Sequence, residues 1–301
     1  MCRSSFKYNL TFIVLFFGIT LIHAGDEGEE TSTNDIKLYY TEWSVPCRSV
    51  MMIGKMLDIP FEMIELDLKK RDRYDSEYEN INPLRKAPVI NDNGFILWES
   101  RAIMVYLVQK YGANHQLNLY PANLQIQANI NKMLQFDMGT LTLAFNNLYG
   151  MWALYKSPKT EYKQTKLLDA FQIFDTLLEN QFAAGNSLTL ADVALFVNII
   201  TIEAAGEINL NEYKNINFWY TKCNTLLTNY KNVNTIGLNI IRQKTEDRKK
   251  EDKDEMVEGL VYNSDFLKAI STLVRGVQSQ VISSEYLYHF KSLETRLLLL
   301  R

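Results

Sequence analysis

The chain has 301 residues and is close to charge balance, with 32 Lys and Arg against 35 Asp and Glu. Hydrophobic residues make up 47% of it, which is ordinary for a chain that folds around a core. These values argue against a disordered chain and against a nucleic-acid binder that works through bulk positive charge. Three scattered cysteines are too few for a disulfide framework, and three separated histidines give little material for a metal site or a Ser–His triad. We therefore expect no bound metal and no nucleic-acid partner.

The N-terminal end differs in character from the rest of the chain. Basic Arg3 and Lys7 precede an apolar run at residues 10–22, which is shorter than the roughly 20 residues of a bilayer span. Residues 1–24 therefore fit a cleaved secretory signal better than a membrane anchor. An uncleaved anchor and a mis-joined first exon stay open as alternatives. Residues 25–35 are acidic and polar, which predicts a flexible leader.

The C-terminal end, residues 246–301, also differs from the middle. Residues 246–255 are charged at every position with mixed sign, which is typical of a solvated helix or a linker. Apolar residues then recur every three or four positions from Phe266 to Val281, which predicts an amphipathic helix. We interpret residues 246–301 as a charged linker followed by a helical extension, which ends in four leucines at 297–300.

The segment 36–111 indicates a compact α/β unit. The expected elements are a strand at 36–40, a helix opened by Pro46, a strand at 61–66, a hairpin of strands at 87–90 and 95–98, and a helix that begins at Glu99-Ser100. Asn93-Gly94 between the last two strands is the strongest hairpin signal in the chain. This order is that of a thioredoxin-like fold, in which the position of Pro88 holds a cis-proline. We therefore expect a cis bond before Pro88, with an ordinary trans-proline at a strand edge as the alternative.

Several ordered blocks of sequence carry a resemblance to a known family. They are Leu38–Tyr40, Ser44–Val50, Ile81–Pro83, Asp92–Phe95, Leu97–Ile103, Leu119–Pro121, Phe136–Leu141 and Ser187–Asp192. Together they resemble the delta/epsilon-class glutathione transferases of arthropods over about residues 36–244. The resemblance implies a thioredoxin-like glutathione-binding domain at 36–116, followed by an all-helical substrate domain at 117–245.

The sequence supports the helical domain independently. Apolar residues recur at helical steps between residues 124 and 154. Thr189 and Asp192 form a pattern like a capping box in front of the apolar stretch 193–196. This pattern predicts the start of a buried central helix and has no bearing on the substrate.

Ser44 is the candidate catalytic residue, because it lies just after the first strand and before the helix opened by Pro46. A thiol has a pKa of about 8.5, and lowering it by two units takes about 2.7 kcal/mol of differential stabilisation. One hydroxyl hydrogen bond and a helix N-terminus can supply that amount. The resemblance implies that Ser44 hydrogen-bonds the glutathione sulfur, and a local capping serine is the alternative.

The resemblance implies further contacts to glutathione. Glu99 offers a partner for the ammonium group, the Ser100 hydroxyl and the N–H groups at the helix start suit the γ-glutamyl carboxylate, and Arg101 adds positive charge. The backbone of Ala87, beside Pro88, would pair with the cysteinyl part. A helix start with an ordinary acidic residue is the alternative interpretation of Glu99, Ser100 and Arg101.

The chain departs from the family where histidines are usual. It has Leu84-Arg85-Lys86 after Asn-Pro, where a histidine normally meets the glycine carboxylate, and Arg73 replaces a second histidine upstream. Arg85 and Lys86 can still bind a carboxylate, so we expect ligand binding to be retained with a different affinity. Exposed surface charge is the alternative for all three residues.

The hydrophobic substrate would lie against the first long helix of the second domain. Phe145, Tyr149 and Trp152 are candidates for an apolar wall, and Thr142 takes a position that tyrosine often fills in the family. Aromatic residues at helical spacing are also typical of a protein core.

We therefore expect a homodimeric enzyme that conjugates glutathione to hydrophobic electrophiles, with peroxide reduction as a related activity. Glutathione would be the co-substrate, and no prosthetic group is implied. The alternatives are a non-catalytic ligand carrier and a thiol oxidoreductase that uses Cys47, although serine replaces the first cysteine of a Cys-x-Pro-Cys pattern here. The N-terminal segment predicts export, whereas the family is usually cytoplasmic.

Overall fold

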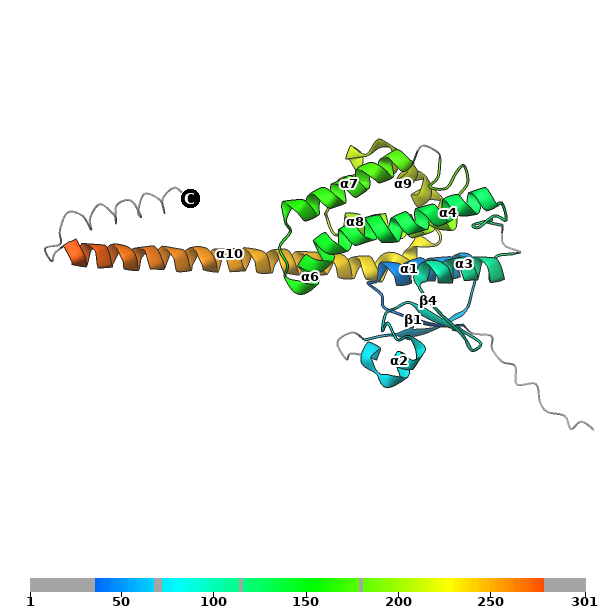
Figure 1. Ribbon diagram of the computed structural model, residues 1–301, viewed down its shortest axis with the longest axis horizontal. Coiled ribbons are helices and arrows are strands. Elements are labelled where there is room, and N and C mark those ends of the chain that lie inside the picture. Colours follow the sequence, from blue (N-terminus) through cyan, green and yellow to red (C-terminus); the bar gives the residue numbers. More distant parts are fainter. Residues whose placement is uncertain (1–35, 68–71, 114–115, 179–180, 279–301) are drawn as a thin grey trace, which may run out of the picture. The chain divides into compact units, whose positions relative to one another are not determined.

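The computed structural model describes residues 36–67, 72–113, 116–178 and 181–278, so the predicted signal segment and acidic leader lie outside it. The first part of the described chain is a four-stranded sheet with its helices (Figure 1). Its elements are β1 (Ile36–Tyr40), α1 (Val45–Met56), β2 (Phe61–Glu65), a short 3-10 turn η1 (Asp72–Tyr74), α2 (Ser76–Ile81), β3 (Val89–Asp92), β4 (Phe95–Trp98) and α3 (Ser100–Tyr111). This order confirms the predicted thioredoxin-like unit.

The sheet has the strand order β2-β1-β3-β4. β1 and β2 are parallel, whereas β3 runs antiparallel to both β1 and β4. Asn93 and Gly94 form the predicted hairpin turn, and both have the positive φ that this two-residue turn requires. The Ala87–Pro88 bond before β3 is cis, as predicted. Helices α1 and α3 lie side by side on one face of the sheet, and α2 covers the other face (Figure 1).

All regular elements between α3 and the last described residue are helical. They are α4 (Leu124–Phe136), η2 (Asp137–Thr142), α5 (Leu143–Phe145), η3 (Asn146–Gly150), α6 (Met151–Tyr155), α7 (Glu161–Leu177), α8 (Leu190–Ala204), η4 (Leu210–Glu212), α9 (Lys214–Leu226), η5 (Lys231–Asn234) and α10 (Thr235–Gln278). Residues 124–155 form one continuous helical stretch, as the apolar spacing predicted, with π-helical turns at η2 and η3. The predicted all-helical second part is therefore confirmed.

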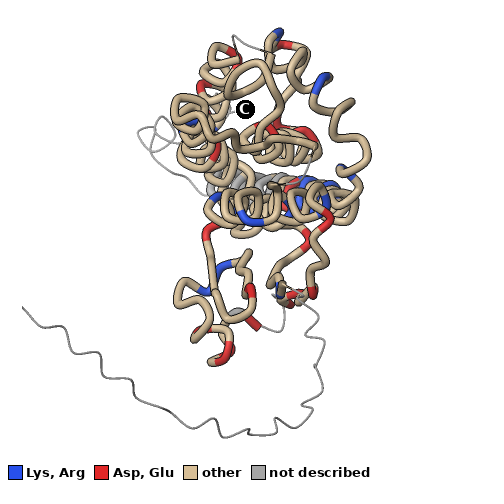
Figure 2. Tube along the Cα trace, turned by 90° about the vertical axis from the view of Figure 1, so that its right-hand side faces the viewer, with Lys and Arg blue, Asp and Glu red and all other residues tan. Residues whose placement is uncertain are grey.

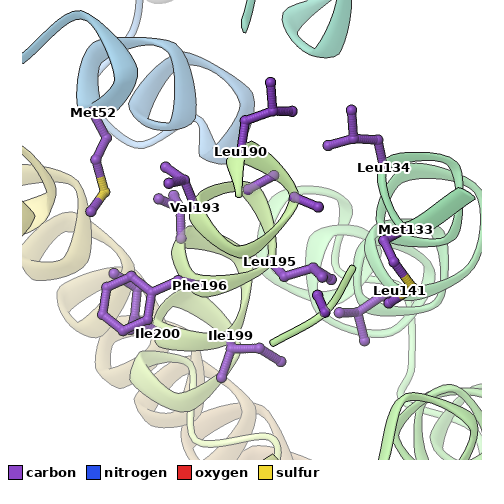
Figure 3. Close-up of a cluster of buried hydrophobic side chains, with 14 of the residues drawn as sticks. Met52, Met133, Leu134, Leu141, Leu190, Val193, Leu195, Phe196, Ile199 and Ile200 are labelled. Carbon is purple, nitrogen blue, oxygen red and sulfur yellow. The ribbon is translucent and has the colours of Figure 1, made fainter. Parts of the chain in front are cut away.

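Helix α8 is the centre of the helical part, because every residue from Leu190 to Ile202 is buried. A helix that is apolar on all sides needs neighbours on all sides, and α8 contacts α1, α4, α9 and α10. Figure 3 shows its apolar side chains between α1 and the α4 region. The predicted capping box is present, because the Asp192 carboxylate accepts hydrogen bonds from the N–H and the hydroxyl of Thr189.

Helix α10 passes without a break through the charged run at 246–255. Arg248 pairs with Glu251 and Asp252 one turn further on, at 2.9 and 2.5 Å, which favours the helical state of this run. The predicted domain boundary between residues 245 and 246 therefore falls inside a helix. The side chains of the apolar pattern that starts at Phe266, and the four terminal leucines, lie outside the described set. Basic and acidic residues are interspersed along the described chain (Figure 2).

The described helices were compared with what a membrane span requires. None of them, α10 included, combines the length and the apolar content that crossing a bilayer requires.

Asp92 at the end of β3 ties the hairpin to α3. Its carboxylate is fully buried, accepts hydrogen bonds from the hydroxyls of Tyr106 and Tyr111 at 2.6 and 2.7 Å, and pairs with Lys110 at 2.7 Å. Burial raises the pKa of Asp92, but these hydrogen bonds outweigh burial and lower the pKa to about 2. Asp92 is therefore ionised in the folded protein at neutral pH and stabilises the junction between sheet and helix.

We expect Asp92→Asn to remove a pH-dependent part of the free energy of unfolding. The unfolded pKa of an aspartate is about 3.9, so the stabilisation is present above pH 4 and is lost as the pH falls toward 2. The substitution should cost about 2 kcal/mol at pH 6 and flatten the pH dependence between pH 4 and 2, measured by urea unfolding. Asp169→Asn, which changes an exposed carboxylate on α7, is the control. Equal acid sensitivity of the Asp92 variant and the unmodified chain would contradict this role.

Candidate active site

Ser44 caps the N-terminus of α1 in the loop that follows β1. Its Oγ accepts a hydrogen bond from the backbone N–H of Cys47 at 3.4 Å, and its own N–H donates to the Thr41 carbonyl at 3.3 Å. The residue is only partly buried. A hydroxyl donates as well as accepts, so Ser44 can hold an anionic sulfur in front of α1, where the helix dipole also favours negative charge.

Strand pairing brings three chain segments to one end of the sheet. Tyr39 of β1 pairs with Val89 at the start of β3, and Val89 pairs with Trp98 at the end of β4. These three residues form one row across the sheet. The segments next to this row are the Ser44 loop after β1, the cis Ala87–Pro88 turn before β3, and Glu99-Ser100 after β4. The register thus gathers most of the predicted glutathione-binding residues at this end.

Hydrogen bonds to the preceding residue, Lys86, fix the turn at Ala87 and Pro88. The Lys86 carbonyl accepts hydrogen bonds from the Tyr78 hydroxyl and the Asn82 side-chain amide, both at 2.7 Å. The backbone N–H and C=O of Ala87 have no partner within the described residues. The turn therefore presents free backbone groups that an extended peptide can pair with.

Glu99 and Ser100 form the start of α3. Glu99 is exposed and has a φ of 72°, a conformation that is uncommon outside glycine, whereas Ser100 is buried. The N-cap residue Glu99 forms no side-chain capping hydrogen bond, so the first N–H groups of α3 are suited to an anion. The Ser100 Oγ accepts a hydrogen bond from Nη1 of Arg101 at 3.5 Å.

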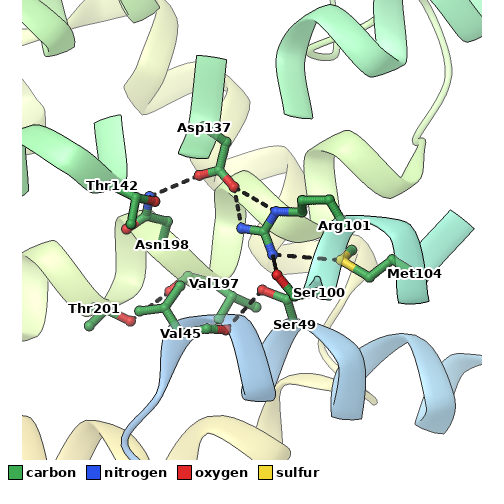
Figure 4. Close-up of polar contacts among 10 residues, drawn as sticks. All are labelled: Val45, Ser49, Ser100, Arg101, Met104, Asp137, Thr142, Val197, Asn198 and Thr201. Carbon is green, nitrogen blue, oxygen red and sulfur yellow. Dashed lines mark hydrogen bonds and ion pairs between the residues drawn. The ribbon is translucent and has the colours of Figure 1, made fainter. Parts of the chain in front are cut away.

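The position of Arg101 differs from the sequence prediction. Its guanidinium lies inside the protein, where Nε and Nη2 bind the Asp137 carboxylate of the helical part, the former at 3.0 Å (Figure 4). Asp137 is fully buried and also accepts a hydrogen bond from Asn198 of α8 at 2.8 Å. Each nitrogen of the Arg101 guanidinium already has a partner. We therefore assign Arg101 a structural role, in which it holds Ser100 and joins the α/β part to the helical part, and no direct contact with glutathione.

Arg85 and Lys86 lie beside the cis turn. Arg85 forms an ion pair with Glu79 of α2 at 2.5 Å and lies over the Tyr74 ring, with 5.4 Å from its guanidinium carbon to the ring centroid. Lys86 is exposed. A carboxylate bound here would therefore compete with Glu79 for Arg85 and would meet Lys86 directly. The side chain of Arg73 lies outside the described set.

The four residues predicted to form the apolar wall are buried. Thr142, Phe145, Tyr149 and Trp152 are 7%, 4%, 4% and 5% exposed. The Thr142 hydroxyl accepts a hydrogen bond from Asn198, and the rings of Phe145 and Tyr149 stack with centroids 5.0 Å apart. The alternative interpretation of these residues as core therefore holds for Phe145 and Tyr149.

Helix α10 is what covers this wall. The Tyr149 hydroxyl contacts Thr245 at 2.9 Å and donates to the Ile241 carbonyl at 3.2 Å, and the Trp152 indole N–H donates to Asp252 at 2.7 Å. Trp152 also borders a cavity of about 650 Å³ between the α6 region and α10. Sequence reasoning missed Thr245 and Asp252 as partners, although buried Tyr and Trp usually need one.

Comparison with known proteins decides the family. Residues 38–115 match a model of the glutathione S-transferase N-terminal domain, and residues 132–226 match one of the C-terminal domain. Glutathione S-transferase D7 of Anopheles gambiae is 34% identical over 203 residues, which cover 66% of this chain and 92% of that protein. The chain belongs to the glutathione S-transferase family.

Solved structures of the family agree with this assignment. A delta-class glutathione transferase of Nilaparvata lugens is 40% identical with a TM-score of 0.67, over 71% of this chain and 99% of that one. The Bombyx mori glutathione transferase BmGSTD1 is 34% identical with a TM-score of 0.67, over 70% and 98%. These relatives support an arthropod-type glutathione S-transferase, as predicted. They are covered almost completely, so nearly a third of this chain has no counterpart in them.

The two cysteines within the described residues of this glutathione S-transferase are not poised for nucleophilic chemistry. Cys47 and Cys223 are fully buried free thiols. Burial raises the pKa of Cys47 to about 11, against a smaller opposite effect of the hydrogen bond with Ser44, and burial also raises the pKa of Cys223. A neutral, buried thiol is a poor nucleophile, which disfavours the thiol oxidoreductase alternative. Within the described residues, no group of three or more His, Cys, Asp or Glu side chains is arranged to hold a metal ion.

We expect Cys47 to resist modification in the folded protein. Incubation with oxidised glutathione at pH 8 should give no mixed disulfide at Cys47 by mass spectrometry, and iodoacetamide should label it at least about 100-fold more slowly than in urea. The sample in urea serves as the control, because there the thiol regains an ordinary pKa. An adduct at Cys47 under native conditions would favour the oxidoreductase alternative.

Proposed function

We propose that this chain is an enzyme that adds the thiolate of glutathione to small hydrophobic electrophiles. The observation that carries the proposal is the meeting of the Ser44 loop, the cis Ala87–Pro88 turn and the start of α3 at one end of the sheet. The family supports a glutathione transferase activity in general. The sulfur–carbon bond forms by attack of the thiolate, and the leaving group departs with the electron pair of the bond that breaks.

Ser44 has the central role in this proposal. Its hydroxyl donates a hydrogen bond to the glutathione sulfur, and the N-terminus of α1 adds a favourable dipole. Together they need to supply about 2.7 kcal/mol to make the thiolate the main form near neutral pH. The same thiolate would attack an organic peroxide, so that the O–O bond breaks, the sulfur becomes a sulfenic acid and the alcohol leaves. A second glutathione would then form the disulfide and release water.

The other residues hold the tripeptide around this sulfur. The free backbone groups of Ala87 pair with the cysteinyl part, as a neighbouring strand would. Glu99 binds the ammonium group, and Ser100 with the uncapped start of α3 binds the γ-glutamyl carboxylate. Lys86, with Arg85 when it is released from Glu79, binds the glycine carboxylate.

Ser44→Ala is expected to lower kcat/KM for a chloronitrobenzene at pH 6.5 by about 10- to 100-fold, because the hydroxyl stabilises the thiolate. The pKa of bound glutathione, followed by the ultraviolet absorbance of the thiolate, should rise in the same variant. Ser49→Ala is the matched control, since Ser49 lies on the same helix and its hydroxyl donates to the Val45 carbonyl at 3.0 Å.

An unchanged rate in Ser44→Ala would remove the serine from this role. Binding of glutathione and apolar ligands by the unmodified chain, without conjugation, would favour the carrier alternative.

We also propose that the chain forms a homodimer through the exposed apolar residues of β4 and α4. Phe95 and Ile96 are 49% and 39% exposed on β4, and Leu124 is 80% exposed on α4. Exposed apolar side chains on an edge strand and on a helix are costly in water and are typical of an interface between copies.

Light scattering should therefore give twice the mass of one chain, and Phe95→Asp should shift the equilibrium toward the monomer by at least about tenfold, because it buries a charge in the interface. Leu168→Asp, on an exposed position of α7, is the control and should leave the mass unchanged. A monomer in the unmodified protein at working concentration would overturn the homodimer.

A further inference from the structure

Arg48 is a buried cation one helical turn after Ser44. It is fully buried, and its backbone N–H donates to the Ser44 carbonyl at 3.0 Å. Its Nη1 donates to the Asn234 side-chain carbonyl of η5 at 2.9 Å, and its Nη2 donates to the Thr201 hydroxyl of α8 at 2.7 Å. Nε is also buried and has no hydrogen-bond partner. The guanidinium is therefore held by neutral oxygens and is only partly satisfied.

No acidic side chain among the described residues forms an ion pair with Arg48. The charged and titratable groups that act on it are Cys47 and Glu42, and Glu65 of β2 acts on Glu42 in turn. α8 and η5 contribute only the neutral Thr201 and Asn234. Burial lowers the pKa of Arg48 to about 10, so it keeps its positive charge at neutral pH. A buried cation without an anionic partner is costly, which calls for a reason to retain it.

The side chain of Arg48 lies against the loop that carries Ser44. A Cβ atom on Gly237, at the start of α10, would lie 2.3 Å from the Glu42 carbonyl oxygen and 2.6 and 2.7 Å from Cδ and Nε of Arg48. The loop, the arginine and the backbone of α10 therefore meet with no free space between them. Helical side chains also lean toward the N-terminus of their helix, which is the end at Ser44.

We propose that Arg48 is a positioning residue whose buried charge, which has no ion-pair partner, stabilises the glutathione thiolate in front of Ser44. This inference rests on the proposed function and deepens it. Because the guanidinium is shielded from water, its field is screened much less than that of a surface lysine. The arriving thiolate adds negative charge near a guanidinium that has no ion-pair partner, while the bonds to Thr201 and Asn234 keep the guanidinium fixed.

The test is a titration of the glutathione thiol bound to the full chain, followed by thiolate absorbance and by the pH profile of kcat/KM. Arg48→Gln should raise the thiol pKa by about one pH unit, so that kcat/KM falls about tenfold at pH 6 and recovers at pH 8.5. Arg48→Lys, which keeps the charge, should restore most of the profile. Lys55→Gln is the matched control, because it removes a positive charge at the far, exposed end of the same helix.

A second variant keeps the test decisive if Arg48→Gln fails to fold. Asn234→Asp places a carboxylate at the position of the oxygen 2.9 Å from Nη1, which neutralises Arg48 without removing it. It should raise the thiol pKa in the same direction. Unchanged pH profiles in the folded variants, with only a lower melting temperature, would overturn the role of Arg48. Absence of conjugation by the unmodified chain would instead overturn the proposed function itself.

Discussion

The antiparallel placement of β3 between β1 and β4 is the constraint on which the site depends. It sets Tyr39, Val89 and Trp98 in one row, so that the Ser44 loop emerges at the same end of the sheet as two segments more than 40 residues further along the chain. A shift of this register by one residue would turn the buried side chains of the sheet outward. The hydrophobic core therefore fixes the register, and the register in turn fixes the site.

Two buried arginines connect this site to the helical part. Arg101 joins the start of α3 to Asp137 and, through it, to Asn198 of α8. Arg48 joins the start of α1 to α8 and η5 through neutral oxygens. The two cations differ in electrostatics, because Asp137 neutralises Arg101 and no ion pair within the described residues neutralises Arg48. The junction at Arg101 holds the two parts together. The junction at Arg48 does the same and also places a positive charge near Ser44.

Local signals were enough to predict much of the α/β part and the start of α8 from the sequence. Pro88, Asn93-Gly94 and the pair of Thr189 and Asp192 act over a few residues, and the structure has the cis bond, the hairpin and the cap. The sequence could not predict that the Arg101 side chain points inward, because its partner Asp137 lies 36 residues away. The cover over Tyr149 and Trp152 was equally out of reach, because it comes from α10, about 100 residues further along. Periodicity showed that these residues share a helix face but gave no information on what packs against it.

The bond between Trp152 and Asp252 has a consequence for the C-terminal extension. The family models end at residue 226, yet α10 continues across Tyr149 and Trp152 as a single rod. In a chain shortened after Thr245, the indole N–H of the buried Trp152 would lose its hydrogen-bond acceptor Asp252. The aromatic rings beneath the helix would also become exposed to water. The segment of α10 up to Asp252 is thus an integral part of the folded body, because Ile241, Thr245 and Asp252 bond with the aromatic residues that it covers.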